Sequence, residues 1–401
     1  MTENNLPLKE LKVLDISTML AAPWASTFLA DFGADVIKVE HPQYGDHARK
    51  YGAQKNGESI FWKTLNRNKR GMTLNLNSSE GKEIFLKLVS KTDVLVENFR
   101  PGTLDKWGLS WETLLEANPC IIVLRTSGFG QEGPYAKRGG FGTVAEAMSG
   151  FASLNGVKDG SPTLPGMALA DGVSSIFGAL SIMIALYGQI KNGLNEGQQI
   201  DINLYEPLMR LLEPQITAYD QLGIIPQPIG NSSLQTAPRN AYLTKDLTWV
   251  ALSGSSQSIT ENIFRAINRE ELIRNPKFIN NKARLQNVKE LDEIISEWIS
   301  KHTYEQVVEI FNSTGAVVGP MYTIPQLLED PHYKQRESFI TVRDEDFGDM
   351  RIPNVVAKFS KTPGRVKSLG PKKGQHTAEI LKNDVKLSDT QIAKLVELGI
   401  I

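Results

Sequence analysis

The sequence predicts an α/β protein with a large domain on a Rossmann-like, mostly parallel sheet and a smaller α+β domain. Three observations indicate this fold class. Short apolar strands alternate with helices over residues 1–222, which is typical of a parallel sheet covered by helices on both faces. A long helix after residue 171 is almost free of charge and is therefore expected in the core. Beyond residue 222, turn-rich segments, a hairpin and helices replace the alternation.

The strands and helices of the large domain, residues 1–222, follow one another in a regular order. Residues 13–16 predict the first strand, and Pro23 stands at the first position of the next helix, where proline is favoured. Gly33 ends this helix before a strand at residues 35–39. Ligands of such sheets bind at the carboxyl ends of the strands. Further helices are expected at residues 79–91, 110–117 and 171–186, and further strands at 73–76, 93–96, 121–124 and 199–204.

The smaller domain is expected at residues 223–330, where a turn-rich linker comes first. Residues 331–401 form a C-terminal segment that returns to the large domain. Ser388 and Gln391 have the spacing of a capping box, which predicts the start of the last helix, and Gly399 ends that helix. The other predicted elements are strands at 241–244, 248–252, 340–343 and 350–352, and helices at 260–268, 291–301 and 304–313.

The composition favours a globular, enzyme-sized protein. A net charge of -1 gives no reason to expect nucleic acid or an anionic membrane as a partner. Residues 1–5 lack the basic and apolar regions of an export signal, so a cytoplasmic location is expected. Cys120 is the only cysteine and lies in an apolar strand pattern, where a buried, inert thiol is expected. The basic pair Lys372-Lys373 is expected on a solvated surface.

Asp171 is the main candidate for chemistry. It opens the uncharged helix, and the unpaired N–H groups and dipole of a helix N-terminus keep a carboxylate ionised. An ionised, partly desolvated carboxylate is a usable nucleophile. The alternative is that Asp171 only caps the helix, which is a common role of aspartate.

Other catalytic patterns are weak or missing. Gly128–Gly133 matches G-x-G-x-x-G, but Pro134 breaks the chain where a dinucleotide fingerprint must open a helix. There is no phosphate-binding G-x-x-x-x-G-K-[ST] loop and no G-x-S-x-G elbow. The five histidines have no metal-ligand spacing, so no metal site is expected. Carboxylates remain as the plausible nucleophiles.

Together with Asp171, four segments in a fixed order carry a resemblance to a known family. The sequence resembles the class III coenzyme A transferases of the CaiB/BaiF type, which include formyl-CoA:oxalate, carnitine and several dicarboxylate CoA-transferases. The resemblance covers most of the chain and is strongest from residue 12 to 210. Its segments are Ala21-Ala22-Pro23, Asn66–Arg70, Val96–Gly102 and Thr126–Pro134.

The resemblance implies a transferase that moves CoA from an acyl-CoA thioester to a carboxylic acid. Asp171 matches the family's aspartate, which forms a mixed anhydride and then an aspartyl-CoA thioester. An anhydride is close in energy to a thioester, whereas a serine ester would be too stable to exchange. CoA and acyl-CoA are substrates, and no permanently bound cofactor is expected. In the family a glycine loop of the small domain closes over the site, and Ser253–Gln257 stands at the matching place with fewer glycines.

The resemblance also implies a CoA site. Lys69 and Arg70 can meet a phosphate or the adenine ring, or they can form an exposed basic turn. Phe99 can contact CoA or belong to the core, and Arg100 can be a surface residue. The implied CoA-binding residues are His41, Leu65, Asn66, Lys69, Asn98, Phe99, Arg100 and Lys106.

The acyl pocket departs from the pattern of some family members. His41 stands where some members have arginine, and Leu20 stands where some have glutamine. A second carboxylate of the substrate could be bound by an arginine, which would favour dicarboxylates such as succinate. The candidates are Arg49, Arg125, Arg210 and Arg239.

The same resemblance leaves two alternative functions open and implies a quaternary structure. An α-methylacyl-CoA racemase needs a histidine before the aspartate, and the matching segment, Gly139–Thr143, contains none. A relative that binds CoA esters without transferase activity is the second alternative. The family's quaternary structure implies a ring-shaped chain in an interlocked homodimer, with linkers near residues 205–235 and 325–345.

Overall fold

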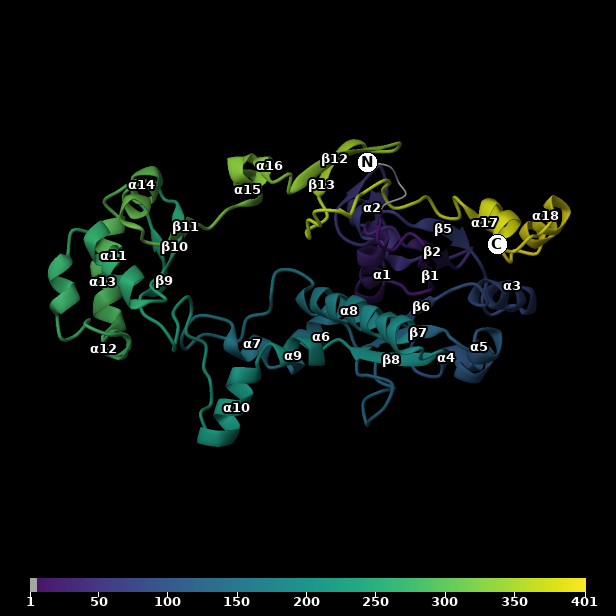
Figure 1. The fold of residues 1–401 in the computed structure, drawn as a ribbon, viewed down its shortest axis with the longest axis horizontal. Helices are drawn as coiled ribbons and strands as arrows, with labels where there is room; N and C mark the ends of the chain where they lie inside the picture. Colours follow the sequence, from purple (N-terminus) through teal and green to yellow (C-terminus); the bar gives the residue numbers. More distant parts are fainter. Residues whose placement is uncertain (1–5) are drawn as a thin grey trace. The chain divides into compact units, whose positions relative to one another are not determined.

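The computed structural model of the chain describes residues 6–401 (Figure 1). The chain forms two compact units. The first comprises the residues up to Ala152, Leu164–Ile224 and Lys334–Ile401, and the second comprises Ser153–Thr163 and Ile225–Tyr333. The C-terminal segment is therefore part of the same unit as the N-terminal strands.

The first unit is built on a six-stranded sheet in the order β5-β2-β1-β6-β7-β8. Every pair of neighbouring strands is parallel, so the α/β class and the parallel sheet predicted from the alternation are confirmed. The strand order reverses between β1 and β6, and such a reversal opens a ligand crevice at the carboxyl ends of the two strands. The strands are β1 (Lys12–Asp15), β2 (Asp35–Glu40), β5 (Arg70–Thr73), β6 (Val94–Glu97), β7 (Ile122–Ser127) and β8 (Gln198–Asn203).

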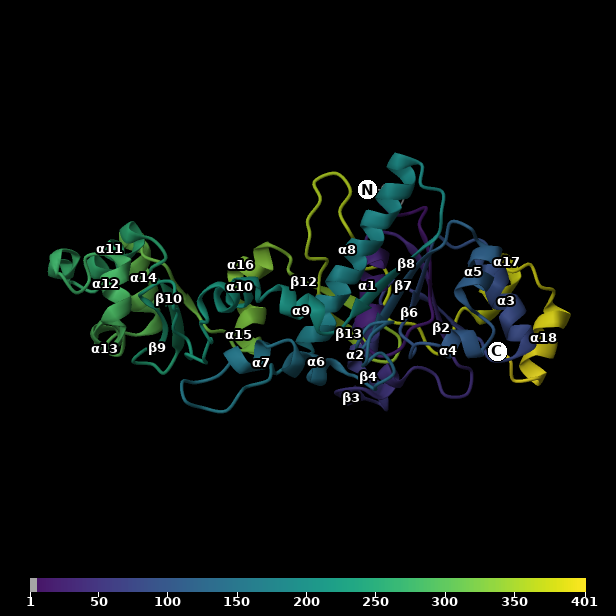
Figure 2. The same cartoon turned by 90° about the horizontal axis from the view of Figure 1, so that it is seen from below.

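Helices cover both faces of this sheet (Figure 2). Successive strand residues point to opposite faces. Val13 therefore packs with α1 (Ala21–Asp31) and α8 (Leu169–Asn192), while Leu14 packs on the opposite face. The helices of that opposite face are α3 (Ser79–Val89), α5 (Trp111–Ala117), α17 (Thr377–Asn383) and α18 (Asp389–Glu397).

Helix α8 is less buried than its sequence predicts. By length and composition it could cross a membrane, but half of its most apolar window is buried inside the protein. It packs along α1 through small residues such as Gly178 and Ala179. The expectation that this helix lies in the core holds for one side of it only, because one row of side chains points outward. Ile176 is 57% exposed, Leu180 52%, Ile184 63% and Tyr187 63%.

The second unit has a three-stranded antiparallel sheet in the order β11-β10-β9. Phe264, Phe278, Leu291 and Phe311 form the centre of its core. Its elements are β9 (Arg239–Leu243), β10 (Trp249–Ser253), α11 (Gln257–Ala266), the 3₁₀ helix η3 (Glu270–Arg274), α12 (Asn281–Gln286), α13 (Val288–Ile299), α14 (Tyr304–Thr314), β11 (Val318–Pro320) and α15 (Ile324–Glu329).

Short elements complete the chain. They are η2 (His47–Lys50), β3 (Gln54–Lys55), β4 (Glu58–Ser59), α2 (Ile60–Leu65), α4 (Thr103–Lys106), α6 (Gly142–Met148), α7 (Phe151–Leu154), α9 (Glu206–Arg210), α10 (Glu213–Leu222), α16 (Pro331–Gln335), β12 (Phe339–Asp344) and β13 (Gly348–Pro353).

Two local predictions were wrong and one is confirmed. The strand expected at residues 73–76 is β5, which ends at Thr73. Cys120 is exposed, because β7 begins only at Ile122 and the cysteine lies in the preceding turn. The predicted capping box is present, with Ser388 as the N-cap of α18 and Gln391 as its partner.

Candidate active site

Two loops meet at the crevice where the strand order reverses. The loop at residues 17–20 follows β1, and Asn98 follows β6. The Thr18 backbone N–H donates to Asn98 Oδ1 at 2.8 Å, and Asn98 Nδ2 donates to the Thr18 carbonyl at 2.6 Å. Asn98 therefore uses its side-chain amide to join the two loops.

A pocket of about 390 Å³ opens beside these loops, and we call it the strand-end pocket. His41 and Phe99, both expected in the CoA site, line it. The His41 ring stacks on Tyr44 with centroids 4.7 Å apart, and the Phe99 ring meets the edge of Trp107 at 5.0 Å. The remaining lining residues are Ile16, Thr18, Val39, Glu40, Gly45, Asp46, Leu74, Asn75, Leu76 and Asn77.

The charged candidates of the CoA site lie near this pocket but not in its lining. Lys106 is the last residue of α4, directly before Trp107, and Arg100 follows Phe99; both residues are exposed. Burial, and in addition the positive charge of Lys373, lower the pKa of His41. A ring of lowered pKa stays neutral at pH 7 and is suited to stacking rather than to binding an anion.

Three other candidates, Leu65, Asn66 and Lys69, lie in the interior. Lys69 is only 2% exposed, and its Nζ donates to Asp15 Oδ2 at 2.9 Å, to the Pro23 carbonyl at 2.7 Å and to Asn66 Oδ1 at 3.0 Å. The exposed basic turn considered for Lys69 was therefore wrong, whereas a contact with CoA stays a prediction. The reason is Asp15, a buried carboxylate that brings the lysine inward.

Lys69 belongs to a buried ionic network beneath the loop at 17–20. Lys38 Nζ lies 3.1 Å from Asp46 Oδ2 and 3.7 Å from Asp15 Oδ1. Although burial opposes it, the charges of Lys38 and Lys69 hold the pKa of Asp15 well below its usual range. Burial lowers the pKa of Lys69 to about 8. Opposite charges of equal number thus compensate each other inside the protein.

The network controls the backbone of the loop above it. Asp46 Oδ1 accepts a hydrogen bond from the Met19 N–H at 3.0 Å, and Asp15 Oδ1 accepts one from the Ser17 N–H at 3.0 Å. Met19 has φ +63°, a left-handed conformation that is uncommon for a residue with a side chain. The ionic network therefore holds the loop in a conformation that the backbone alone does not favour.

Asp171 lies in a second pocket, of about 430 Å³, on the other side of the same loop. Thr18 lines the strand-end pocket, whereas Met19 and Leu20 line the pocket of Asp171. The loop is thus a wall shared by the two pockets. The other lining residues are Tyr51, Phe141, Gly142, Thr143, Glu146, Pro165, Gly166, Met167 and Ala168.

Asp171 is not the cap of its helix, which corrects the alternative considered from the sequence. It is the third residue of α8, and the N-cap position is held by Ala168, which makes no side-chain bond. Glu146 of α6 supplies the cap instead, because its Oε1 accepts hydrogen bonds from the N–H groups of Leu169 at 3.0 Å and Ala170 at 3.3 Å.

The carboxylate of Asp171 is packed closely and titrates near neutral pH. A Cβ atom at Gly142 would lie 2.3 Å from Asp171 Oδ2, so only glycine fits there. Burial, followed by the negative charge of Glu146, raises the pKa of Asp171 to about 6, against the hydrogen bond from its own backbone N–H. The expected stabilisation by the helix terminus is weaker than burial, because Glu146 occupies two of the free N–H groups.

Neither Glu146 nor Gly142 was predicted from the sequence to belong to the site. One signal was available, since Glu146 is the only charged residue between Arg138 and Lys158. An isolated carboxylate in an apolar helix is buried only with hydrogen-bond partners. Those partners come from a helix that begins more than twenty residues later, and no local pattern shows this pairing.

None of the four candidate arginines lines the Asp171 pocket within residues 6–401. Arg49 pairs with both oxygens of Glu40 at 2.7 Å and lies over the Trp62 ring. Arg125 lies 3.6 Å from Glu97, and the Arg210 guanidinium pairs with Glu213. Arg239 belongs to the second unit, where it donates to the Ser232 carbonyl.

The loop at Ser253–Gln257 is held in the second unit. The Gly254 N–H donates to the Pro238 carbonyl at 2.7 Å, and the Gly254 carbonyl accepts from the Thr260 hydroxyl at 3.2 Å. A Cβ atom at Gly254 would lie 2.7 Å from Pro238 Cδ. This glycine is therefore required for close packing against the proline.

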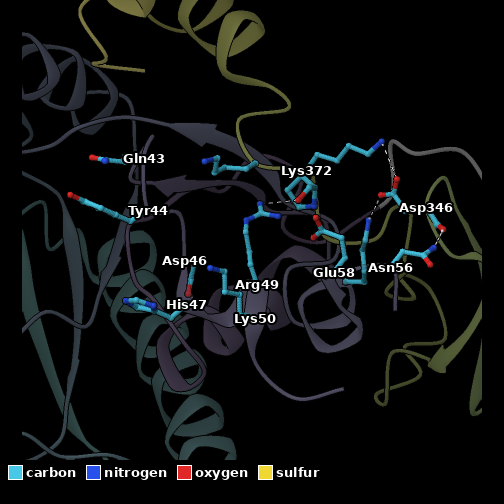
Figure 3. Close-up of a pocket in the computed structure, with 14 residues that line it drawn as sticks. Gln43, Tyr44, Asp46, His47, Arg49, Lys50, Asn56, Glu58, Asp346 and Lys372 are labelled. Atoms are coloured by element: carbon cyan, nitrogen blue, oxygen red, sulfur yellow. Dashed lines mark hydrogen bonds and ion pairs between the residues drawn. The ribbon is translucent and has the colours of Figure 1, made fainter. Parts of the chain in front are cut away.

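A further pocket, of about 880 Å³, contains many charged side chains (Figure 3). Gln43 and Tyr44 lie at one side of it, and Lys372 and Asp346 lie at the other. Within residues 6–401, no cluster of histidine, cysteine, aspartate or glutamate has the arrangement that could hold a metal ion.

Comparison with known proteins shows the class to which this architecture belongs. Residues 8–377 match the family described as CoA-transferase family III. A solved structure of a CAIB/BAIF family protein from Brucella suis matches with a TM-score of 0.82 at 30% identity, covering 95% of this chain and 100% of that chain. The chain belongs to CoA-transferase family III, and the resemblance noted in the sequence is confirmed.

Two curated relatives are named as CoA-transferases. The succinyl-CoA–D-citramalate CoA-transferase of Chloroflexus aurantiacus is 38% identical, over 97% of this chain and 96% of that protein. The beta subunit of the succinyl-CoA–L-malate CoA-transferase of the same organism is 39% identical, over 98% of each. With this identity over nearly the whole chain, the protein is a CoA-transferase.

Proposed function

We propose that this CoA-transferase moves CoA from succinyl-CoA, or a similar dicarboxylic acyl-CoA, to a second carboxylic acid, with Asp171 as the nucleophile. The observation that carries the proposal is a partly buried carboxylate in a pocket that shares one loop with the strand-end pocket. The names of two relatives pair succinyl-CoA with D-citramalate and with L-malate, and both acceptors are dicarboxylates.

In this proposal the adenosine end of CoA occupies the strand-end pocket and the thioester reaches Asp171. The rings of His41 and Phe99 offer flat faces on which an adenine can stack. Arg100 and Lys106 are exposed beside that pocket and can meet the phosphates. Leu65, Asn66 and Lys69 act by supporting the loop at 17–20 rather than by contact with CoA.

The reaction proceeds by exchange between anhydride and thioester. An Asp171 oxygen attacks the thioester carbonyl, the C–S bond breaks, and CoA leaves as thiolate. The thiolate then attacks the aspartyl carbonyl of the mixed anhydride, which releases the donor acid and leaves an aspartyl-CoA thioester. Each bond broken is close in energy to the bond formed, so the exchange stays reversible.

The second half of the reaction repeats these steps in reverse. The acceptor carboxylate attacks the aspartyl-CoA thioester, and CoA leaves again as thiolate. The thiolate attacks the acyl carbonyl of the new anhydride, which forms the acceptor's CoA ester and frees the Asp171 carboxylate. A pKa of about 6 leaves Asp171 mostly ionised at pH 7, as its attack on the donor thioester requires.

We further propose that the enzyme works as a homodimer, and the interlocked arrangement of the family remains part of this proposal. The outward row of apolar side chains on α8, headed by Ile176, Leu180 and Ile184, supports an interface. Apolar rows of this kind on a surface helix are typical of surfaces that bind another protein chain. The occupant proposed here is a second copy of this chain.

Trapping of the acyl-enzyme tests the proposed mechanism. Succinyl-CoA is mixed with the protein and the peptide containing Asp171 is followed by mass spectrometry, with hydroxylamine added in a parallel sample. We expect an adduct at Asp171 and a hydroxamate after hydroxylamine, while Asp171→Ala gives neither and loses turnover. More than a trace of turnover in that variant would contradict the assignment. Initial rates with malate, citramalate and oxalate then identify the acceptor.

A further inference from the structure

The strand-end pocket has no cation of its own. Its lining contains two carboxylates, Glu40 and Asp46, and neither lysine nor arginine. Both carboxylates are already compensated, because Glu40 pairs with Arg49 and Asp46 pairs with Lys38. CoA carries phosphates at its adenosine end, so a molecule bound here requires a cation from outside the lining.

Lys373, from the C-terminal segment, lines the neighbouring pocket of about 880 Å³ and lies against a turn that also lines the strand-end pocket. Its Nζ donates to the Pro42 carbonyl at 2.9 Å, next to the lining residue His41. A Cβ atom at Gly45, another lining residue, would lie 3.4 Å from Lys373 Cδ. The lysine stem therefore lies along the turn from His41 to Asp46, which forms one side of the pocket.

The segment that carries Lys373 is firmly anchored. The Pro371 carbonyl accepts hydrogen bonds from Arg49 Nη2 at 3.0 Å and from Trp62 Nε1 at 2.9 Å. The His376 N–H donates to the Gly71 carbonyl at 2.8 Å, which ties the segment to β5. Hydrogen bonds on both sides of Lys373 thus tie its backbone to the rest of the unit.

Lys373 also differs from its cationic neighbours in charge compensation. Lys372 lies 3.1 Å from Glu345 and 3.3 Å from Asp346, and Figure 3 shows its side chain directed toward Asp346. Lys63 lies 2.9 Å from Asp344. In the described part of the chain, no carboxylate pairs with Lys373, whose ammonium has only the Pro42 carbonyl as its acceptor.

We propose that Lys373 binds a phosphate group of the CoA ester held in the strand-end pocket. This inference rests on the proposed function, since it requires CoA at that site. The ammonium leaves the Pro42 carbonyl and donates to phosphate oxygens, which forms a stronger, charge-assisted hydrogen bond. The sequence predicted only a solvated surface for Lys372 and Lys373. In the folded chain Lys372 pairs with carboxylates, whereas Lys373 lies beside the strand-end pocket without such a pair among the described residues.

Calorimetric titration of the full-length protein with CoA tests this inference. Lys373→Ala is expected to weaken CoA binding about tenfold, and Lys372→Ala, as the matched control, changes it less than twofold. Lys373→Arg should retain most of the affinity. Thermal unfolding of each variant shows that the fold is intact. Equal affinity of the wild type and Lys373→Ala for CoA would overturn the inference.

A second titration, with 3′-dephospho-CoA, identifies the phosphate. If the wild type and Lys373→Ala bind this compound equally, the contact is to the 3′-phosphate. If the variant remains about tenfold weaker, the contact is to the diphosphate; both results support the inference. Failure of the proposed function is distinguishable, because the wild type would then bind no CoA or form no adduct at Asp171.

Discussion

At the scale of single residues, two neighbours from another helix set the surroundings of the proposed nucleophile, Asp171. Gly142 leaves room for the carboxylate, and Glu146 both caps α8 and places a negative charge nearby. Burial and this charge together bring the pKa of Asp171 to about 6. The carboxylate is therefore less stabilised than a surface aspartate, yet still ionised at neutral pH.

The pH dependence of the reaction follows from this pKa. Because protonated Asp171 cannot attack, kcat/KM should fall as the pH decreases through about 6. Glu146→Gln removes a charge that raises the pKa of Asp171, so the acid limb should move to lower pH. Rates measured from about pH 5 to 8 check this, and an unmoved limb in Glu146→Gln would show that the charge has no effect.

A methyl group at Gly142 should displace the proposed nucleophile, Asp171. The added Cβ would lie 2.3 Å from Asp171 Oδ2, so the carboxylate must shift. Gly142→Ala is expected to reduce kcat about 100-fold, since small misplacements of reacting groups have effects of this size. Gly166→Ala is the control, because it lines the same pocket and its Cβ would meet nothing within 4 Å. Equal losses in both variants would contradict the close contact.

At the scale of elements, one loop organises the site. The loop at 17–20 separates two pockets, and its backbone is held from below by Asp15 and Asp46 and from the side by Asn98. The left-handed Met19 turns the chain so that Thr18 and Leu20 face different pockets. The buried carboxylates Asp15 and Asp46 therefore hold the position of this loop.

If the buried ions hold the structure around this loop, removal of one buried cation should lower the stability of the protein. Lys69→Met leaves Asp15 with one fewer partner in the interior, which is expected to lower the free energy of unfolding by about 3 kcal/mol. The exposed Lys106→Met is the control and should leave it nearly unchanged. Urea unfolding measures both, and equal stability of the two variants would refute the structural role of Lys69.

At the scale of the whole molecule, residues from the two ends of the chain share one unit. The Trp62 indole N–H donates to the Pro371 carbonyl. The Thr73 backbone N–H donates to the Thr377 hydroxyl oxygen, and the hydroxyl groups of Thr73 and Thr377 are hydrogen-bonded to each other. The outer surface of this unit carries the apolar row of α8. Exposure of such a row to water is unfavourable, and a second chain that covers it would lower the free energy of the protein.

A charge in this row should separate the proposed dimer. Ile184 is 63% exposed, so Ile184→Glu is tolerated by the fold but places a carboxylate in the interface. Light scattering at micromolar concentration should give the dimer mass for the wild type and a lower mass for the variant. Val396→Glu on α18, 59% exposed, is the control and should remain dimeric. A monomeric wild type would refute the homodimer.

Much of the fold and part of the site could be predicted from the sequence. The alternation of strands and helices indicated the parallel sheet, and Ser388 with Gln391 indicated the last helix, because both patterns are local. The sequence predicted that α8 lies in the core, but one row of its side chains is exposed. Composition shows that a helix is apolar but not which of its sides packs against the rest of the protein. The role of Asp171 stays a prediction until an adduct is trapped.

The sequence alone determined the periodic patterns of the strands and helices, the family, and the position of Asp171 at the start of an uncharged helix. Only the tertiary structure decided which charges are neutralised. Lys69 meets Asp15 across 54 residues of chain, while Lys373 arrives beside His41 from the opposite end and pairs with no carboxylate of residues 6–401. Periodicity is a property of neighbouring residues, whereas ion pairing depends on distances that exist only after folding.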